Sequence, residues 1–250
     1  MRILGVSVHP TSYQEAVSQV TSWAKLKESR YVCAANVHMV MEARDSRSFM
    51  QVVNDADLVT PDGMPLVWVM RRLGFPHQAR VYGPDLMVEL IEASARGFIP
   101  VGFYGGSPEV LADLLDRIKA RHPSLNVAYS FSPPFRPLSE EEEAGIVDAI
   151  NSAGVRILFV GLGCPKQERW MARHRGKIHA VMLGVGAAFD FYAGRKPQAP
   201  AWMQRSGLEW LYRLLKEPRR LWKRYLYHNP RFIVLALDQI FHGGERFDGR

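Results

Sequence analysis

The stretch Ile157–Trp170 reads ILFVGLGCPKQERW and decides the fold assignment. Its first four residues are apolar, as is typical of a strand buried on both faces. Gly161 and Gly163 end that run, and Pro165 follows at a position suited to the first turn of a helix. The stretch therefore predicts a buried strand, a tight turn and a helix that starts with polar residues. An ordinary turn and a phosphate-binding turn both stay open, because the pattern is neither G-x-G-x-x-G nor a P-loop.

Strand-like and helical patterns alternate along the first 194 residues. Apolar runs predict strands at residues 3–8, 31–35, 57–59, 99–104, 125–129, 157–160 and 180–184. Capped or amphipathic segments predict helices between them, with Ser12 and Ser139 as N-caps. This alternation favours an α/β fold whose mostly parallel, Rossmann-like sheet carries helices on both faces.

The pattern changes near residue 195, beyond which no strand pattern remains. The sequence there predicts helices that are broken at Pro218 and Pro230. We therefore expect an α/β core over residues 1–194 and a helical appendage over residues 195–250.

The appendage is basic and aromatic. Between residues 205 and 231, eight basic residues against two acidic ones give +6 of the chain's net charge of +7. Its aromatic residues are Trp202, Trp210, Tyr212, Trp222, Tyr225 and Tyr227. This combination suits an anionic membrane surface, and less so nucleic acid, which we do not expect as a partner. The alternative is a helical pair that packs its aromatic residues on the core and leaves the charges in solvent.

Composition narrows the class of protein. Cys33 and Cys164 are the only cysteines, so a disulfide framework is not expected and a reducing compartment is. The apolar run at the N-terminus is too short for a signal peptide. No run approaches the roughly 18 apolar residues that span a bilayer. We expect a cytoplasmic protein.

Polar or glycine residues follow several predicted strands. They are Asn36, Asp62 with Gly63, Gly105 with Gly106, residues 161–168 and residues 184–190. Because the carboxyl ends of parallel strands meet at one edge of a sheet, these segments predict a shared ligand cleft.

Asp62 is the candidate general base in this cleft. It lies in a Thr-Pro-Asp-Gly turn between a buried strand and an apolar helix. Partial burial raises the pKa of a carboxyl toward the range useful for removing an alcohol proton. Pro-Asp-Gly is also an ordinary turn sequence, so a purely structural role stays open.

The other polar candidates each have a functional and a structural interpretation. Asn36 orients a sugar hydroxyl or caps the next helix, and Arg80 binds a phosphate or pairs with a surface acid. Gln167 donates to a phosphate or sugar, whereas Lys166 neutralises a diphosphate or is simply solvated. Asp190 accepts from a uracil or ribose, or caps a helix. No metal site is expected, because the histidines form no H-x-x-x-H, so Lys, Arg and helix dipoles must supply positive charge.

Motifs along nearly the whole chain resemble one family. They are T-P-D-G (60–63), R-V-Y-G-P-D-L-M (80–87), F-Y-G-G (103–106), V-G-L-G-C-P-K-Q-E-R-W (160–170), G-V-G-A-A-F-D-F-Y-A-G (184–194) and the tail G-L-E-W-L-Y-R-L-L-K-E-P-R-R-L-W-K-R-Y (207–225). In this order they resemble the WecG/TagA/CpsF glycosyltransferases.

The resemblance implies an inverting, metal-independent transferase that needs no cofactor. Such enzymes move a sugar from a UDP donor to a polyprenyl-diphosphate-linked saccharide at the inner face of the cell membrane. Asp62 matches the base, Asn36 and Gln167 match active-site amides, and Arg80 matches an active-site arginine. Residues assigned to the UDP-sugar are Thr60, Gly63, Tyr104, Gly105, Gly106, Gly163, Lys166, Gln167, Gly186, Phe189 and Asp190.

In this family the tail closes over the site and stabilises the departing diphosphate. Arg213, Arg220 and Arg224 match that role, although Arg219 is adjacent to Arg220 and leaves the choice between them open. Ala34 stands where the family often has threonine, so the donor is N-acetylmannosamine, glucose or a related hexose. A smaller departure is Gln198, where an arginine is usual.

Two rivals remain at this point. One is a nucleotide-dependent α/β enzyme of another class, such as an oxidoreductase, which the absence of G-x-G-x-x-G disfavours. The other is a non-catalytic adaptor that binds membrane or nucleic acid. A homo-oligomer is compatible with either interpretation.

Overall fold

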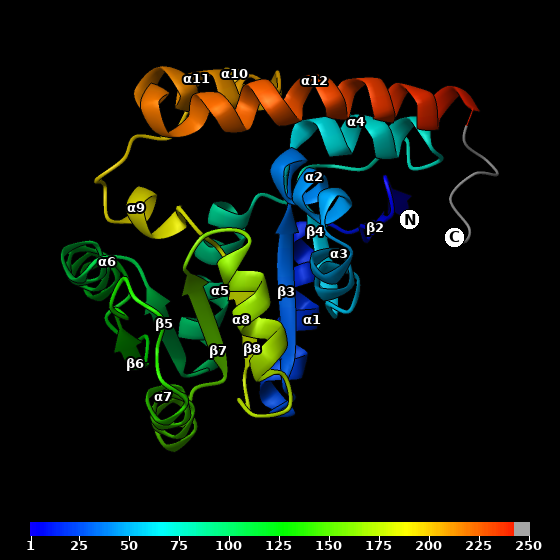
Figure 1. Ribbon diagram of the computed structural model, residues 1–250. Helices are drawn as coiled ribbons and strands as arrows, with labels where there is room; N and C mark the ends of the chain where they lie inside the picture. Colours follow the sequence, from blue (N-terminus) through cyan, green and yellow to red (C-terminus); the bar gives the residue numbers. More distant parts are fainter. Residues whose placement is uncertain (243–250) are drawn as a thin grey trace.

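A six-stranded parallel sheet forms the centre of the computed structural model, which describes residues 1–242 (Figure 1). The strands run in the order β4–β3–β8–β7–β5–β6, and every neighbouring pair is parallel. Their bounds are β3 Arg30–Ala35, β4 Leu58–Pro61, β5 Val101–Gly105, β6 Val127–Phe131, β7 Ile157–Gly161 and β8 Val181–Gly184. The predicted α/β fold is confirmed.

Helices cover both faces of this sheet. One face carries α1 (Tyr13–Lys25), α5 (Gly83–Gly97), α6 (Pro108–Arg121) and α9 (Ala188–Tyr192). The other carries α2 (Val37–Asp45), α3 (Arg47–Asn54), α4 (Met64–Arg72), α7 (Glu140–Ser152) and α8 (Lys166–His174). Leu158 and Val160 of β7 enter the second layer, whereas Ile157 and Phe159 enter the first. The uninterrupted apolar run of β7 therefore reflects burial on both faces.

Both predicted N-caps are confirmed, because each side chain accepts a hydrogen bond from a backbone N–H of its helix. Ser12 and Ser139 both form capping boxes, with Glu15 and Glu142 returning the hydrogen bond. Each box pairs two backbone N–H groups that a helix start leaves free.

Two predicted elements differ from the structure near the chain ends. Residues 3–8 are not one strand but a hairpin of β1 (Arg2–Ile3) and β2 (Val6–Ser7), because Leu4 and Gly5 adopt positive φ angles of 49° and 93°. Pro218 does begin a new helix, but Pro230 lies inside it. Pro230 and Leu226 are both exposed, so the carbonyl that loses its partner is on the solvent side of the helix.

The C-terminal helices lie across one end of the core (Figure 1). They are α10 (Ala201–Arg205), α11 (Glu209–Lys216) and α12 (Pro218–His242). Helix α12 packs on α2 and α4, and its Phe232 and Ala236 are buried in the core. The Gln239 amide accepts from the Leu4 backbone N–H at 3.0 Å and donates to the Arg2 carbonyl at 2.8 Å. The last eight residues of the predicted appendage fall outside the described part of the chain.

Membrane spans were searched over the same residues. None of the helices there combines the length and the apolarity needed to cross a bilayer.

Gly105 provides a test of the β5–β7 contact. Its φ is +122°, and a Cβ built on it would lie 2.6 Å from the Gly161 carbonyl oxygen. We expect Gly105→Ala to lower the free energy of unfolding by more than about 2 kcal/mol, since it adds backbone strain to a steric clash. Gly145→Ala lies at an exposed position of α7, where nothing is within 4 Å of the added Cβ. This change should instead raise the free energy of unfolding by about 0.5–1 kcal/mol. Urea denaturation measures both, and equal stabilities would contradict the prediction.

Candidate active site

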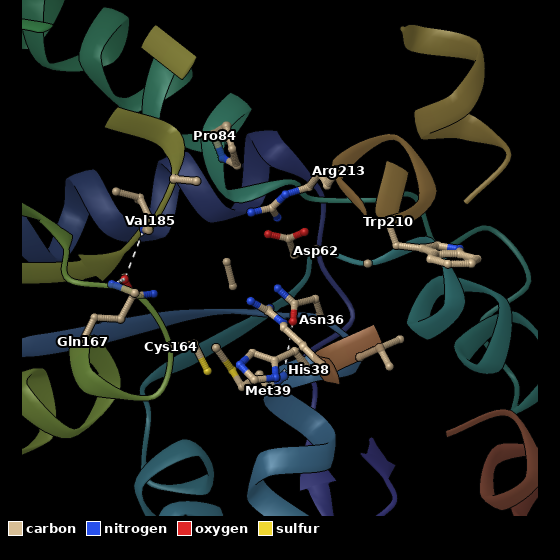
Figure 2. A pocket seen from close by; sticks show the side chains of 18 of the residues that line it. Asn36, His38, Met39, Asp62, Pro84, Cys164, Gln167, Val185, Trp210 and Arg213 are labelled. Atoms are coloured by element: carbon tan, nitrogen blue, oxygen red, sulfur yellow. Dashed lines mark hydrogen bonds between the residues drawn. The ribbon is translucent and has the colours of Figure 1, made fainter. Parts of the chain in front are cut away.

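A cleft of about 1370 Å³ opens at the carboxyl ends of the strands, where the C-terminal helices cover the core. Figure 2 shows Asp62, Asn36, Gln167 and Arg213 around one space. The predicted site residues that line it are Asn36, Asp62, Gly63, Arg80, Tyr104, Gly106, Gly163, Lys166, Gln167, Gly186, Asp190, Arg213, Arg220 and Arg224. The structure therefore brings core and appendage candidates to one place.

Three predicted site residues lie behind the cleft wall. Thr60 is fully buried and its hydroxyl donates to the Val81 carbonyl at 3.3 Å. Phe189 packs edge-on against Phe103, with ring centroids 5.8 Å apart. Gly105 lies against the backbone of Gly161. These three residues therefore contact the chain behind the residues that line the cleft.

Asp62 follows β4 directly, and backbone contacts fix its position. Its N–H donates to the Ala35 carbonyl at 2.9 Å, which joins the ends of β3 and β4. Carboxylate Oδ2 accepts from the Gly83 N–H at 3.2 Å, and Oδ1 lies 3.4 Å from Arg80 Nη2. Arg80 Nε also donates to the Asp62 carbonyl. These contacts hold the carboxylate at the N-terminus of α5 and restrict its rotation.

The surroundings of Asp62 have opposite effects on its pKa. Burial raises the pKa of Asp62 to about 6, the Arg80 charge lowers it, and the Glu209 charge raises it. Only 8% of the residue is exposed, so the loss of solvation outweighs the attraction of the arginine. The result is a carboxylate that is ionised at neutral pH and more basic than an aspartate in water.

Arg80 connects this carboxylate to the appendage. Its Nη2 lies 2.6 Å from Oε2 of Glu209 on α11, and its guanidinium stacks 3.8 Å from the centre of the Tyr82 ring. The Tyr82 hydroxyl donates to Oε1 of the same Glu209 at 2.9 Å. Glu209 therefore binds two core residues with its two oxygens. Glu209 is not among the predicted site residues, although it lies in the G-L-E-W segment of the tail, because its partners are more than 120 positions away in the sequence.

Asn36 and Gln167 are both held by the protein. Asn36 caps α2, with its side-chain oxygen accepting from the Met39 N–H at 3.2 Å. Gln167 Oε1 accepts from the N–H groups of Gly163 and Gly186 at 3.0 and 3.1 Å. Its amide therefore joins the turn after β7 to the turn after β8.

Glu168 extends the Gln167 contacts into the interior. Its Oε1 accepts from Gln167 Nε2 at 2.8 Å, and none of the residue is exposed. Burial raises the pKa of Glu168 to about 7. The start of α8 therefore points one polar side chain into the cleft wall and a second beneath it.

The three selected tail arginines lie on the cleft, and their neighbour Arg219 does not. Arg220 Nε donates to Glu217 at 2.7 Å. Arg224 Nε is buried and has no hydrogen-bond partner within residues 1–242. Of the adjacent residues Arg219 and Arg220, it is therefore Arg220 that lines the cleft.

Lys166 and Asp190 lie at two neighbouring turns. Lys166 is exposed and is the first residue of α8. Asp190 Oδ1 lies 3.3 Å from Lys196 Nζ, which is also 3.6 Å from Glu217 Oε2 in the appendage. Both arrangements leave the charged groups at the edge of the cleft.

Comparisons with known proteins agree on one family. The profile of the "Glycosyl transferase WecG/TagA/CpsF family" matches residues 1–246. A curated relative from Bacillus spizizenii is 30% identical over 218 residues, which cover 87% of this chain and 82% of the relative. That protein is named N-acetylglucosaminyldiphosphoundecaprenol N-acetyl-beta-D-mannosaminyltransferase.

The Arg80–Glu209 contact predicts a change in the titration of Asp62. In Glu209→Gln a negative charge is removed and Arg80 is freed to approach Asp62, and both effects stabilise the ionised carboxylate. We expect the pKa of Asp62, about 6 in the wild type, to fall. Carbon-13 NMR of the Asp62 carboxyl across pH 4–8 measures it. Asp238→Asn, which removes an exposed acid at the far end of α12, should leave the midpoint in place; an unchanged midpoint in both variants would contradict the coupling.

Proposed function

This chain belongs to the WecG/TagA/CpsF family of glycosyl transferases, and we propose that it moves a hexose from a UDP-sugar to a polyprenyl-diphosphate-linked saccharide in cell-surface polysaccharide synthesis. Family membership makes the chain a hexosyltransferase and decides against an oxidoreductase or a non-catalytic adaptor. The observation that carries the proposal is the buried carboxylate of Asp62 in one cleft with three tail arginines.

Asp62 acts as the general base in this proposal. It accepts the proton of the acceptor hydroxyl while the hydroxyl oxygen attacks the anomeric carbon of the donor. Its raised pKa suits this step, because a base is most effective when it is ionised and its pKa is near the working pH. A single displacement by the acceptor inverts the configuration at the anomeric carbon.

Positive side chains stabilise the departing UDP. Arg213, Arg220 and Arg224 reach the cleft from α11 and α12, and Lys166 reaches it from the start of α8. Arginine binds phosphate oxygens in a bidentate manner, so the set neutralises the diphosphate as the glycosidic bond breaks. We therefore propose that the transfer is metal-independent.

The donor sugar lies against the turns that Gln167 joins. The Gly163 and Gly186 backbones allow close approach, and in this proposal Asp190 accepts a hydrogen bond from the uridine. Ala34 also lines the cleft, and the Cβ of Ala34 lies 3.2 Å from the position of a Cβ built on Gly83. The relative's activity favours N-acetylmannosamine as donor, with glucose or a related hexose as the alternative that Ala34 allows.

Apolar side chains of α4 and α12 form part of the cleft lining, which supports a lipid-linked acceptor. Trp68 and Val69 line it from α4, and Ile233, Leu237 and Ile240 line it from α12. A polyprenyl chain is apolar along its length, so this part of the lining matches its chemistry.

Exposed apolar side chains on α12 support peripheral attachment to the inner face of the cell membrane. Leu226, Val234 and Phe241 are 66%, 67% and 74% exposed. Trp222 and Tyr227 are also exposed, among the basic residues of the same helix. A basic helix with exposed aromatic and aliphatic residues lies in the interface of an anionic bilayer.

Replacing the proposed base tests the mechanism. Asp62→Asn keeps the shape of the side chain and removes its basicity, so we expect turnover to fall by about 100- to 10,000-fold. UDP binding, measured by calorimetry, should stay near the wild-type value. In the wild type, kcat/KM should rise with pH through about 6, because Asp62 must be ionised to accept the proton.

Turnover of the wild type and of Asp62→Asn is measured as UDP release from a panel of UDP-sugars in the presence of a lipid-linked acceptor. Glu140→Gln, a change in the exposed first turn of α7, serves as the matched acid-to-amide control. Wild-type turnover in Asp62→Asn would refute the role of Asp62 as base.

Membrane attachment is tested on the outer face of α12. Leu226→Asp with Val234→Asp places two carboxylates on an apolar surface, so we expect vesicle sedimentation with anionic lipid to be lost. Leu26→Asp, on an equally exposed leucine of the core (67%), should bind vesicles like the wild type. UDP binding confirms that each variant is folded, and undiminished sedimentation of the double variant would exclude this surface.

A further inference from the structure

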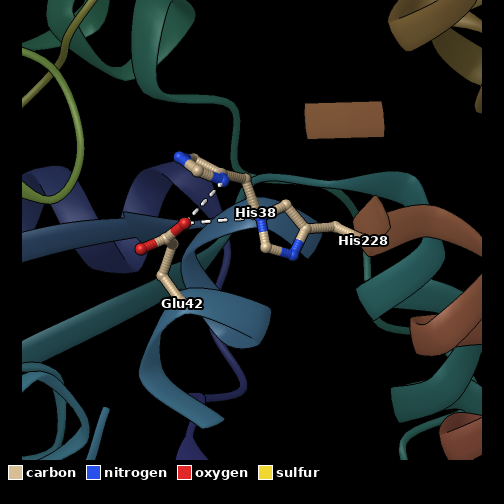
Figure 3. A group of neighbouring side chains, drawn as sticks. All are labelled: His38, Glu42 and His228. Atoms are coloured by element: carbon tan, nitrogen blue, oxygen red, sulfur yellow. Dashed lines mark ion pairs between the residues drawn. The ribbon is translucent and has the colours of Figure 1, made fainter. Parts of the chain in front are cut away.

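A cluster of two histidines and a glutamate joins α2 to α12 (Figure 3). His38 and Glu42 are one turn apart on α2, and His228 comes from α12. One ligand atom of each lies within 4.8 Å of the other two. None of the three residues belongs to the set proposed above to bind UDP-sugar or to act on it.

The separations suit a small cation. Glu42 Oε1 is 3.3 Å from His228 Nε2 and 3.8 Å from His38 Nδ1. Zinc binds imidazole nitrogen and carboxylate oxygen at about 2.0–2.2 Å, which places tetrahedral neighbours about 3.3–3.6 Å apart. One pair already has this spacing, and a second reaches it with a few tenths of an ångström of side-chain movement. The ring nitrogens of His38 and His228, which lie within 4.8 Å of each other, complete the third pair when the two rings turn toward the ion.

The His38 ring shows which atom is available to such a cation. The ring contacts the backbone of Cys164, whereas Nδ1 is buried and has no hydrogen-bond partner within the described residues. The unpartnered nitrogen is the one that faces Glu42. A neutral imidazole held through one nitrogen and open at the other is the usual state of a histidine ligand.

Neighbouring contacts fix the two helices in the register that the cluster needs. Arg231 makes a two-pronged ion pair with Asp45, at 2.8 and 2.7 Å. Arg231 follows His228 by three residues, and Asp45 follows Glu42 by three. This pair holds α2 against α12 one turn away from the cluster, so the ligand atoms are brought together without the metal.

We propose that His38, Glu42 and His228 form a binding site for a zinc-like divalent cation, with water completing the coordination, and that the bound ion fastens the appendage to the core. Imidazole and carboxylate ligands select Zn²⁺ over Mg²⁺, which prefers an all-oxygen shell. His38 also lines the cleft, but none of the three ligands is a group proposed to take the acceptor proton or to bind UDP, so the site is compatible with metal-independent transfer. The charge of Arg224 acts on both rings, and the negative charge of Glu42 offsets its repulsion of a bound cation.

Metal titration of the full chain tests the site. After treatment with a chelator, the wild type should bind one Zn²⁺ per chain in calorimetry and should not bind Mg²⁺. Co²⁺ bound in its place should give the intense visible absorption of a four-coordinate site. Because loss of an outer-shell partner alone costs about 10- to 100-fold in metal affinity, His228→Ala and Glu42→Gln should each weaken Zn²⁺ binding by about 100-fold or more.

His242→Ala supplies the matched control, since His242 is an exposed histidine on the same helix that pairs only with Asp238 among described residues. It should bind Zn²⁺ like the wild type. Circular dichroism shows that each variant is folded, and His228→Gln keeps the test available if the alanine variant is not.

Limited proteolysis measures the effect on the appendage. Zn²⁺ should slow cleavage between residues 195 and 242 in the wild type and leave the rate unchanged in His228→Ala. Equal Zn²⁺ affinity in the wild type and in the His228 and Glu42 variants would overturn the proposal. These readouts use no sugar nucleotide, so they are independent of the outcome for Asp62.

Discussion

The ion pair between Arg80 and Glu209 joins the two parts of the molecule that form the cleft. Arg80 holds the proposed base through both its backbone and its carboxylate, and Glu209 holds Arg80 from the appendage. Side chains this buried are costly to leave unpaired, so docking of α11 and correct placement of Arg80 depend on each other. The site is therefore complete only when the C-terminal helices lie on the core.

A second buried polar group organises the opposite wall. Gln167 accepts from two loop N–H groups and donates to Glu168, so both ends of its amide are satisfied by protein. Glycine loops that approach a ligand have no side chains to brace them. A buried amide that spans two such loops fixes their separation, which a rigid binding surface requires.

The sequence predicts the sheet and the strand-end residues well for a physical reason. Strands such as β7 are buried on both faces, so their apolar runs are uninterrupted, and parallel topology then brings their polar ends to one edge. The predicted helix break at Pro230 was wrong, because Pro230 lies on the exposed side of α12, where solvent can bond the carbonyl that loses its partner. Neither Glu209 nor the His38–Glu42–His228 cluster was predicted. Glu209 of α11 meets Arg80, and His228 of α12 meets Glu42 of α2, so both contacts join residues that are far apart in the sequence. Local spacing places Glu42 one turn from His38, but it does not show that His228 or Glu209 would reach the core.

The two hydrogen bonds of Gln239 have a consequence for how the protein is made. They tie the last described helix to Arg2 and Leu4, across 235 and more positions. During translation, Arg2 and Leu4 are synthesised at least 235 residues before Gln239. The sheet and its flanking helices are therefore synthesised while the N-terminal hairpin still lacks its Gln239 hydrogen bonds, so these bonds form late in folding.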